Sequence, residues 1–396
     1  MHVTIGEMDS DWISAITSWE GKELLTKADP LDSIPMAKEP MILLEETSPH
    51  GNLEAVVEQD DRVAYLYVRA PGRTDLEFKS LWLRNLSAAP EKVNAAEMRE
   101  GLAPMLSIEN CLHPTGKEPL DGSRLRFLWF PEGDGVALLE DGQPLAVVPS
   151  WAITGEFPGY SRDAVGESFL CWGLAEATEI FDRVRAAVTY WNDWNRDPTP
   201  WQLCQNAFLA EYERALGPHS RYFAIDGKEW PYKALIRTDT TDAIYLLTLG
   251  ISLRPQPQVE MYYEDASDFR RFEFAACFAP GAKEETITRM ANYLSGQSTL
   301  PWENITFLGN GHTIPCDAFR DDPDLHHFTA VLLIDQPPGA PELNPPRMEG
   351  DRVMLLWAIP ITERERQLVI ERKSAAFVEK FPADWPLHRI AKRPPL

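Results

Sequence analysis

Four side chains with metal-binding or nucleophilic chemistry lie close together in the last third of the chain: His312, Cys316, His326 and His327. Thiolate and imidazole groups are zinc ligands, and four of them suffice for a closed tetrahedral site. Their spacing matches no standard zinc module, however, and the adjacent His326 and His327 would point to opposite faces of a strand. A buried cysteine beside polar loop histidines is the alternative that we favour, so we expect no metal and no cofactor.

The same residues could form a Cys–His pair for nucleophilic catalysis. Such a pair needs a thiol of lowered pKa and a third group that orients the base, and the sequence indicates neither. Each Gly-Lys pair is followed by Glu, whereas a P-loop needs Ser or Thr at that position. We therefore expect a protein without catalytic activity, and the alternative is an uncharacterised enzyme or metal-binding protein that uses Cys316 and the three histidines.

Carboxylate groups are numerous, and the densest group surrounds two arginines. Its members are Glu260, Glu264, Asp265, Arg270, Arg271 and Glu273. Charge compensation on a solvated sheet face explains this group better than general acid–base catalysis does. Glu132 and Asp134 precede a hairpin, and we interpret them as turn-forming residues.

Trp302 differs from the other tryptophans because it lies in a short polar segment, between Pro301 and Glu303-Asn304. An exposed aromatic ring beside acidic and amide groups has the composition of an anchor in a protein interface. A ring that covers the core where the loop folds back is the second interpretation. Both interpretations stay open on the sequence alone.

The elements that would position these groups are those of an α+β protein. In the first half we expect a helix over 11–19, strands at 53–58, 62–69 and 77–86, a hairpin of 136–140 and 144–149, and a helix over 175–194. Asp141-Gly142 between the two hairpin strands favours a type I′ turn, because Gly adopts positive φ at little cost.

The second half begins with a helix at Pro200, since Thr199 and Gln202 form a capping box. Apolar runs at 244–253, 328–334 and 353–359 predict central strands of one mixed, largely antiparallel sheet that helices cover on both sides. The run 271–278 alternates between apolar and polar residues and predicts a half-buried strand. A helix over 283–295 should end at Gly296, and a second capping box starts the last helix at Thr362.

The chain divides into an N-terminal α+β domain of unknown role at 1–195, a second domain at 199–385 and an extended basic tail at 386–396. The prolines at 198 and 200 favour a junction between the two domains. From 361 to 396 there are eight Lys and Arg against five Asp and Glu. We expect this region to be a solvated terminal helix followed by an extended tail.

The formal net charge of −23 excludes nucleic acid and anionic membrane surfaces as expected partners and suits a basic protein partner. The sequence has no apolar run of membrane-spanning length and no signal-peptide pattern. The five cysteines are odd in number and widely spaced, which favours reduced thiols. These features together predict a cytoplasmic protein.

The second half resembles the suppressor-of-fused domain. The resemblance is carried by the order and spacing of five stretches, at 245–252, 272–274, 300–305, 328–333 and 355–363. The resemblance implies a mixed α/β fold and a protein-binding role without known catalysis. The animal member of the family sequesters a transcription factor by clamping a short peptide strand.

The first half is similar to the extra N-terminal region of some bacterial members, which have been suggested to be immunity proteins that neutralise toxins. The resemblance also places four residues near the family's peptide-binding surface: Tyr293, Trp302, Glu303 and Asn304. The loop that contains the last three lacks the family's usual small-residue and aspartate pattern, which implies a different ligand. We therefore expect a protein-binding module, either an immunity protein or a sequestering regulator.

Overall fold

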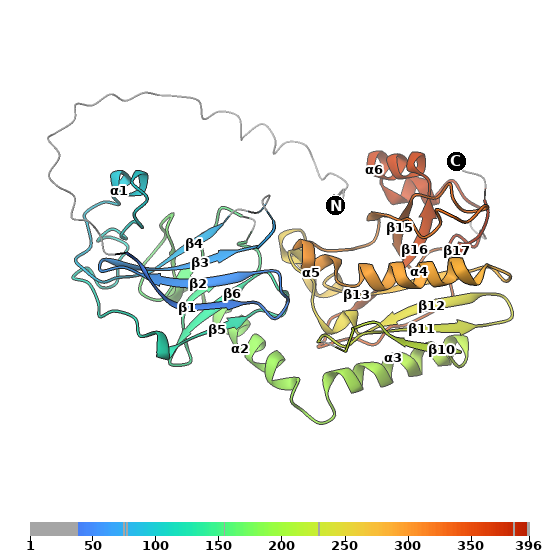
Figure 1. Ribbon diagram of the computed structural model, residues 1–396, viewed down its shortest axis with the longest axis horizontal. Helices are drawn as coiled ribbons and strands as arrows, with labels where there is room; N and C mark the ends of the chain where they lie inside the picture. The colour runs from blue at the N-terminus through green and yellow to red at the C-terminus, as the bar shows by residue number, and fades with distance from the viewer. Residues whose placement is uncertain are drawn as a thin grey trace.

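The computed structural model describes residues 39–73, 76, 78–153, 155–228, 230–382 and 385–393. Within these ranges the chain is an α+β protein with three β-sheets and six α-helices (Figure 1), which confirms the predicted fold class. The helix expected over 11–19 lies outside the described residues. None of the described helices is both long enough and apolar enough to cross a membrane.

Two sheets pack face to face in the N-terminal half, which we define as residues 39–193. Leu66 and Trp82 of the first sheet and Leu138 and Val148 of the second share one buried cluster. The first sheet is antiparallel and consists of β1 (Met41–Thr47), β2 (Glu54–Gln59), β3 (Val63–Arg69) and β4 (Lys79–Asn85). The second consists of β5 (Leu125–Trp129), β6 (Val136–Glu140), β7 (Gln143–Val148), β8 (Tyr160–Ser161) and β9 (Trp172–Gly173).

Two helices complete this half. The short α1 (Ala95–Arg99) precedes β5, and α2 (Thr178–Asp193) packs on the outer face of the second sheet, where Ile180 and Val184 meet the apolar residues of β6 and β7. The predicted hairpin is confirmed, because Asp141 and Gly142 both adopt positive φ, 51° and 77°, between β6 and β7. Positive φ at both central residues defines the type I′ turn.

The C-terminal half, residues 200–393, is built on one eight-stranded sheet with the order β10-β11-β12-β13-β16-β15-β14, and β17 also pairs with β13. Its strands are β10 (Arg221–Ala224), β11 (Ala234–Asp239), β12 (Ile244–Leu249), β13 (Arg271–Phe278), β14 (Thr313–Pro315), β15 (Ala330–Asp335), β16 (Val353–Ile361) and β17 (Arg389–Ile390). All pairs are antiparallel except β13 with β16 and β13 with β17. The predicted mixed, largely antiparallel sheet is thus confirmed.

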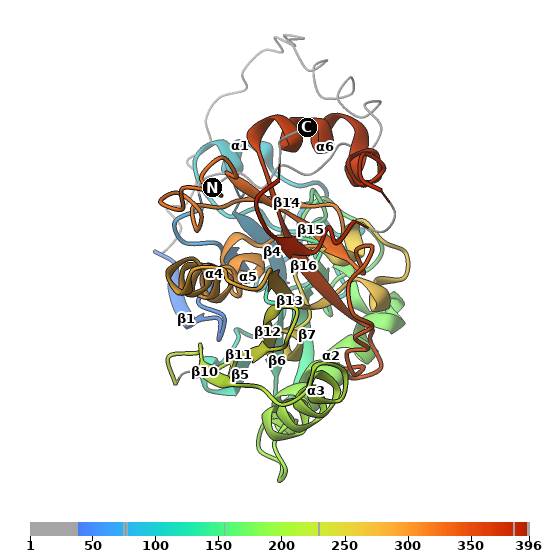
Figure 2. The ribbon, with the colours of Figure 1, turned by 90° about the vertical axis from the view of Figure 1, so that its right-hand side faces the viewer.

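Helices cover both faces of this sheet, as predicted. Ile287, Met290 and Leu294 of α4 (Glu284–Gln297) belong to the core on one face. α3 (Pro200–Leu216) and α6 (Glu363–Val378) cover the other face, with α3 near β10 and α6 near β15 (Figure 2). Both predicted capping boxes are present, at Thr199–Gln202 and at Thr362–Glu365.

Three local predictions are wrong. All eight residues of β13 are buried, because this strand lies between β12 and β16 in the middle of the sheet and is covered on both faces. Gly296 lies inside α4, which continues to Gln297. The segment expected as a polar loop is a short helix, α5 (Leu300–Asn304), that ends at Ile305 with a φ of 46°.

Residues 387–393 of the expected extended tail pack on the C-terminal domain. Leu387, His388 and Ile390 are buried, and the two residues of β17 extend the sheet beside β13. Arg393 pairs with Glu365 of α6 through both carboxylate oxygens, at 2.5 and 2.8 Å. The tail packs on the domain because its apolar side chains enter the core and its basic groups find carboxylate partners.

Candidate binding site at the contact between the two halves

α5 is the element that joins the two halves, and Trp302 lies at its centre. The ring is 1% exposed, and its Nε1 donates a hydrogen bond to the Pro255 carbonyl at 3.1 Å. It stacks on Phe272 in the C-terminal core. The burial corresponds to the second interpretation of the sequence, in which the ring covers the core rather than projecting into solvent.

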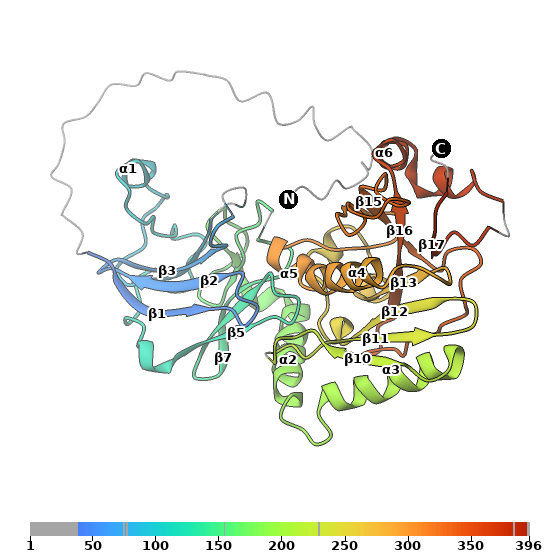
Figure 3. The same cartoon turned by 45° about the vertical axis from the view of Figure 1, so that its right-hand side comes forward.

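The backbone of α5 is held by side chains of the N-terminal half. Asn52 donates from Nδ2 to the carbonyl of Gly133 at 2.6 Å and to that of Trp302 at 2.9 Å, so one amide group joins both halves. Arg73 donates to the Asn304 carbonyl, and Ile305 belongs to the apolar core of the N-terminal half. Figure 3 shows α5 facing the N-terminal sheets, while α2 and α3 meet at the linker below.

Arg254 stacks on Trp302 at this contact, with its guanidinium carbon 3.8 Å from the ring centroid. Its Nη1 lies 3.3 Å from Nδ1 of His50, which comes from the N-terminal half. Burial lowers the pKa of Arg254 to about 10. The pKa of His50 lies well below its usual value, first because of burial and then because of the charge of Arg254, although the Phe130 carbonyl opposes the shift.

A second polar group crosses the contact between the halves. Arg183 of α2 pairs with Glu132 at 3.3 Å and with Glu260 of the C-terminal half at 2.6 Å. Asp134 is fully buried and accepts a hydrogen bond from the Gln258 backbone amide. Burial and then the charge of Glu132 raise its pKa well above the usual range. Glu132 and Asp134 lie in the turn before β6, as interpreted from the sequence, and their side chains also connect the two halves.

Glu273 is also buried, at 0% exposure, so its assignment to a solvated sheet face is wrong. Its Oε1 accepts from the amides of Gly250 and Ser252 and from the Ser252 hydroxyl, and its Oε2 accepts from the Thr248 hydroxyl. Burial raises its pKa to about 7, although these hydrogen bonds oppose the shift. The group holds the end of β12 against β13, and the hydrogen bonds that the described residues form with it all lie in the C-terminal core.

Tyr293 lies at a separate place, a hollow of ≈ 420 Å³ beside β14. The hollow is lined by Tyr293, Gln297, Pro315, Cys316, Asp317, Arg320, His326, Phe328 and Thr329. Tyr293 donates to the Pro315 carbonyl at 3.0 Å. The structure therefore does not bring the four predicted partner-binding residues together: Trp302 and Asn304 contact the N-terminal half, Glu303 is exposed, and Tyr293 lines this hollow.

Within the described residues, no group of three or more His, Cys, Asp or Glu side chains is arranged to hold a metal ion. Cys316 and His326 line the same hollow, whereas His312 contacts Phe307. The rings of His326 and His327 are 6.0 Å apart and perpendicular. Burial raises the pKa of the Cys316 thiol to about 12, which is the opposite of what a nucleophilic cysteine needs.

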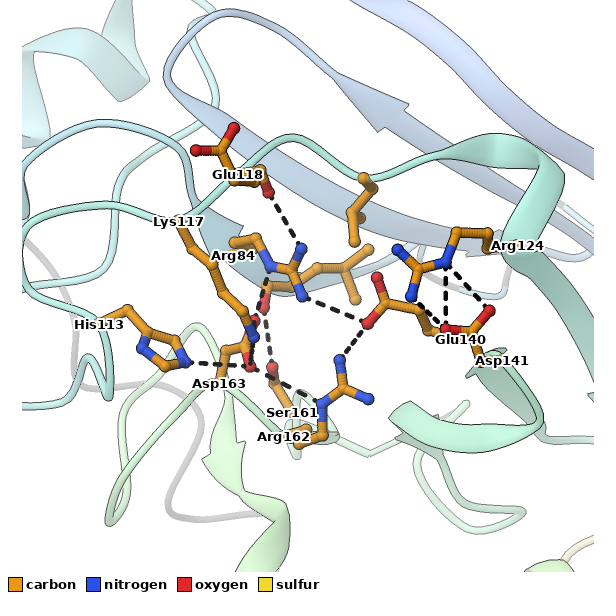
Figure 4. A network of polar contacts seen from close by, with 12 residues as sticks. Arg84, His113, Lys117, Glu118, Arg124, Glu140, Asp141, Ser161, Arg162 and Asp163 are labelled. Carbon is orange, nitrogen blue, oxygen red and sulfur yellow. Dashed lines mark hydrogen bonds and ion pairs between the residues drawn. The ribbon is translucent and has the colours of Figure 1, made fainter.

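The N-terminal half contains an ion-pair network of its own (Figure 4). Asp163 is 2% exposed and accepts from Arg84 at 2.7 Å and from Lys117 at 3.0 Å, and Glu140 contacts both Arg84 and Arg162. Burial raises the pKa of Asp163, but the bonds from Arg84 and Lys117 outweigh this and leave it lowered. The network joins β4, β6 and β8, so its role is to hold this half together.

Sequence reasoning missed Asn52, His50 and Arg254, because no motif links residues that are about 200 positions apart. One signal was available for Arg254. It follows directly after the apolar run 244–253, which is the only feature of the sequence that associates it with buried residues.

Comparison with known proteins supports the resemblance found in the sequence. Residues 231–391 match the family model described as "Suppressor of fused protein (SUFU)", so the predicted suppressor-of-fused domain in the C-terminal half is confirmed. No curated protein matches the chain. Among solved structures, a chain of "the Sufu-Fu complex crystal structure" is similar at 12% identity and a TM-score of 0.34, over 48% of this chain and 91% of that chain.

Proposed function

We propose that this protein is a non-catalytic protein-binding module that captures an extended segment of a partner protein at the β14 edge of its C-terminal sheet. The partner would be either a toxin, which this protein neutralises as an immunity protein, or a factor that it sequesters. The match of residues 231–391 to the suppressor-of-fused family supports a role in protein interaction. We further propose the division into domains at 1–195 and 199–385.

The observation that carries the proposal is the open edge of the sheet beside the Tyr293 hollow. β14 is the last strand in the sheet order and pairs only with β15 among the described strands. An extended peptide can add to an edge strand. At β14 it would replace Tyr293 as the partner of the Pro315 carbonyl, because Pro315 has no N–H and Thr313 and Ile314 are buried. The adjacent hollow of ≈ 420 Å³ has Phe328 and Tyr293 in its lining and is large enough for a partner side chain.

Charge and redox chemistry support the choice of partner and compartment. A net charge of −23 favours association with a basic protein and disfavours nucleic acid or an anionic bilayer. All five cysteines are buried and free, which suits the reducing cytoplasm that we propose as the location. The raised pKa of the Cys316 thiol does not support the enzyme alternative.

Affinity capture from the native cells, quantified by mass spectrometry, tests the proposal with matched variants. We expect wild type to retain one protein in near-stoichiometric amount, and Tyr293→Ala to lose it at least about tenfold, as truncation of a central interface aromatic does. The control is Tyr262→Ala, because this tyrosine is also partly exposed, at 37%, but lines no part of the hollow. Equal recovery by both variants, or no specific partner with wild type, would contradict the proposal.

A further inference from the structure

Arg254 is a buried cation that has no carboxylate partner among the described residues. Its side chain belongs to a residue that is 3% exposed, and two of its donor atoms, Nε and Nη2, have no hydrogen-bond partner. Among the described residues it forms no ion pair, and its remaining polar contact is the His50 ring at 3.3 Å. A buried charge left in this way costs several kcal/mol unless something compensates for it.

The other buried arginines of this chain are paired. Arg393 has Glu365, Arg271 has Asp351 and Glu349, and Arg84 has Asp163. In each case a carboxylate group of the same chain lies within bonding distance of the guanidinium. Arg254 therefore departs from a pattern that the same chain follows elsewhere, and its missing partner is a property of this position.

Aromatic rings contact Arg254, and the charge of Glu303 acts on its pKa without forming an ion pair that the described residues show. Its guanidinium carbon lies 3.8 Å from the Trp302 ring and 5.6 Å from the Trp230 ring. Cation–π contacts of this kind offset part of the desolvation but satisfy no N–H donor. The Nε1 donor of Trp230 is likewise buried without a partner, so unpaired donors from two residues lie in one aromatic enclosure.

We infer that Arg254 is the anchor of an oxyanion site at the contact between the two halves, which takes a carboxylate or a phosphate group. The planar fork of a guanidinium bonds two oxygens of such a group at once, and the two unpaired atoms Nε and Nη2 form one edge of that fork. This inference is independent of the partner edge at β14.

The anion reaches the site by displacing the aromatic lid. The donors are covered in the closed structure, and the packing behind them is tight, since a Cβ added to Gly133 would meet His50 at 3.0 Å and Trp302 at 3.1 Å. Trp230 is only partly buried, so its side faces solvent. Movement of this partly exposed ring would uncover Arg254, and the hydrogen bond of Asn52 to the Trp302 carbonyl does not involve it.

Two ligands can supply the oxyanion that Arg254 binds: a free phosphate ion and a carboxylate group of a bound peptide. Titrations of the full chain with phosphate and with acetate, each against chloride at equal ionic strength, distinguish them. We expect saturable quenching or enhancement of tryptophan fluorescence, because Trp302 touches Arg254. Saturation near a hundredfold excess over Kd should raise Tm by roughly 5 °C. A response to phosphate alone assigns the site to phosphate, and a response to acetate assigns it to carboxylates.

Arg254→Met is the decisive variant, since Met keeps the apolar stem and removes the unpaired charge. We expect it to unfold at the same temperature as wild type or higher in chloride, and to lose the response to both anions. Arg393→Met, which removes a paired arginine, should lower Tm but keep the anion response. The inference is overturned if wild type shows no saturable response to either anion, or if Arg254→Met responds as wild type does. If Arg254→Met does not fold, the presence or absence of a saturable fluorescence response in wild type decides whether the inference holds.

Discussion

A carboxyl group in the middle of the C-terminal sheet makes the stability of this fold depend on pH. Burial raises the pKa of Glu273 to about 7 in the folded state, against 4.5 for the ordinary group. A raised folded pKa means that the contribution of this group is complete below pH 4.5 and is lost as pH rises through 7. Because of this residue, the free energy of unfolding therefore falls as the pH rises from 4.5 to neutrality.

Glu273→Gln should remove this pH dependence. The amide keeps an oxygen acceptor for the Gly250 and Ser252 donors and cannot ionise. Between pH 5 and pH 8 the variant should gain about 3 kcal/mol in unfolding free energy relative to wild type. Urea unfolding at both pH values measures the difference. Glu303→Gln is the control because its side chain is exposed, and equal slopes for Glu273→Gln and wild type would contradict the prediction.

The burial of Glu273 could not be predicted from the alternation of Phe272, Glu273 and Phe274. The pattern is that of a half-buried strand, and the four donors that satisfy the carboxylate lie 21 to 25 positions earlier in the chain. The same limit applies to Trp302. The polar residues beside it were compatible with an exposed anchor. The surface that covers α5 is identified by contacts with distant residues such as Asn52, which lies 250 positions away.

At the scale of elements, the predictions that succeeded rest on local chemistry. The capping boxes of α3 and α6 and the Asp141-Gly142 turn each involve residues within four positions of one another. β17 could not be predicted, because two residues carry no periodicity and their pairing with β13 depends on tertiary contacts. α5 was missed for a related reason, since a helix of five residues has no apolar stripe.

The packed tail is an element whose stability depends on one ion pair. Arg393→Met removes the guanidinium that neutralises Glu365, which is 1% exposed, so the variant should lose about 3–5 kcal/mol of unfolding free energy. Lys392→Ala is the matched control, because Lys392 pairs with Asp324 at the surface with 74% of its side chain exposed. This control should change the unfolding free energy by less than about 1 kcal/mol.

Adding Glu365→Gln to Arg393→Met should recover part of the loss. Gln removes the buried charge and still accepts the capping-box hydrogen bond from the Thr362 amide. Guanidinium chloride denaturation of the three variants and wild type measures these differences. A loss as large for Lys392→Ala as for Arg393→Met would show that general tail charge, rather than the buried pair, holds residues 387–393 in place.

At the scale of the whole molecule, the contact between the halves is polar as well as apolar. Asn52, Arg183 and Asp134 each bond across it, and Ile305 places an apolar side chain of the C-terminal half in the N-terminal core. Separating the halves would break these hydrogen bonds and expose the apolar side chain to water. It would therefore cost more free energy than separating two surfaces of exposed charges. The two halves should therefore open together rather than independently.

Asn52→Ala tests this coupling, because it leaves the buried carbonyls of Gly133 and Trp302 without their shared donor. An unsatisfied buried group costs about 1–3 kcal/mol, so amide hydrogen exchange near both carbonyls should accelerate roughly 5- to 150-fold. Mass spectrometry should find the increase in peptides covering 130–135 and 300–306 alike. Asn110→Ala is the control, since the side chain of Asn110 bonds within the N-terminal half, to Ser107, Val165 and Glu167 among the described residues, and it should leave 300–306 unchanged. An effect of Asn52→Ala confined to residues 48–53 would mean that the halves are held by their other contacts and open without this amide.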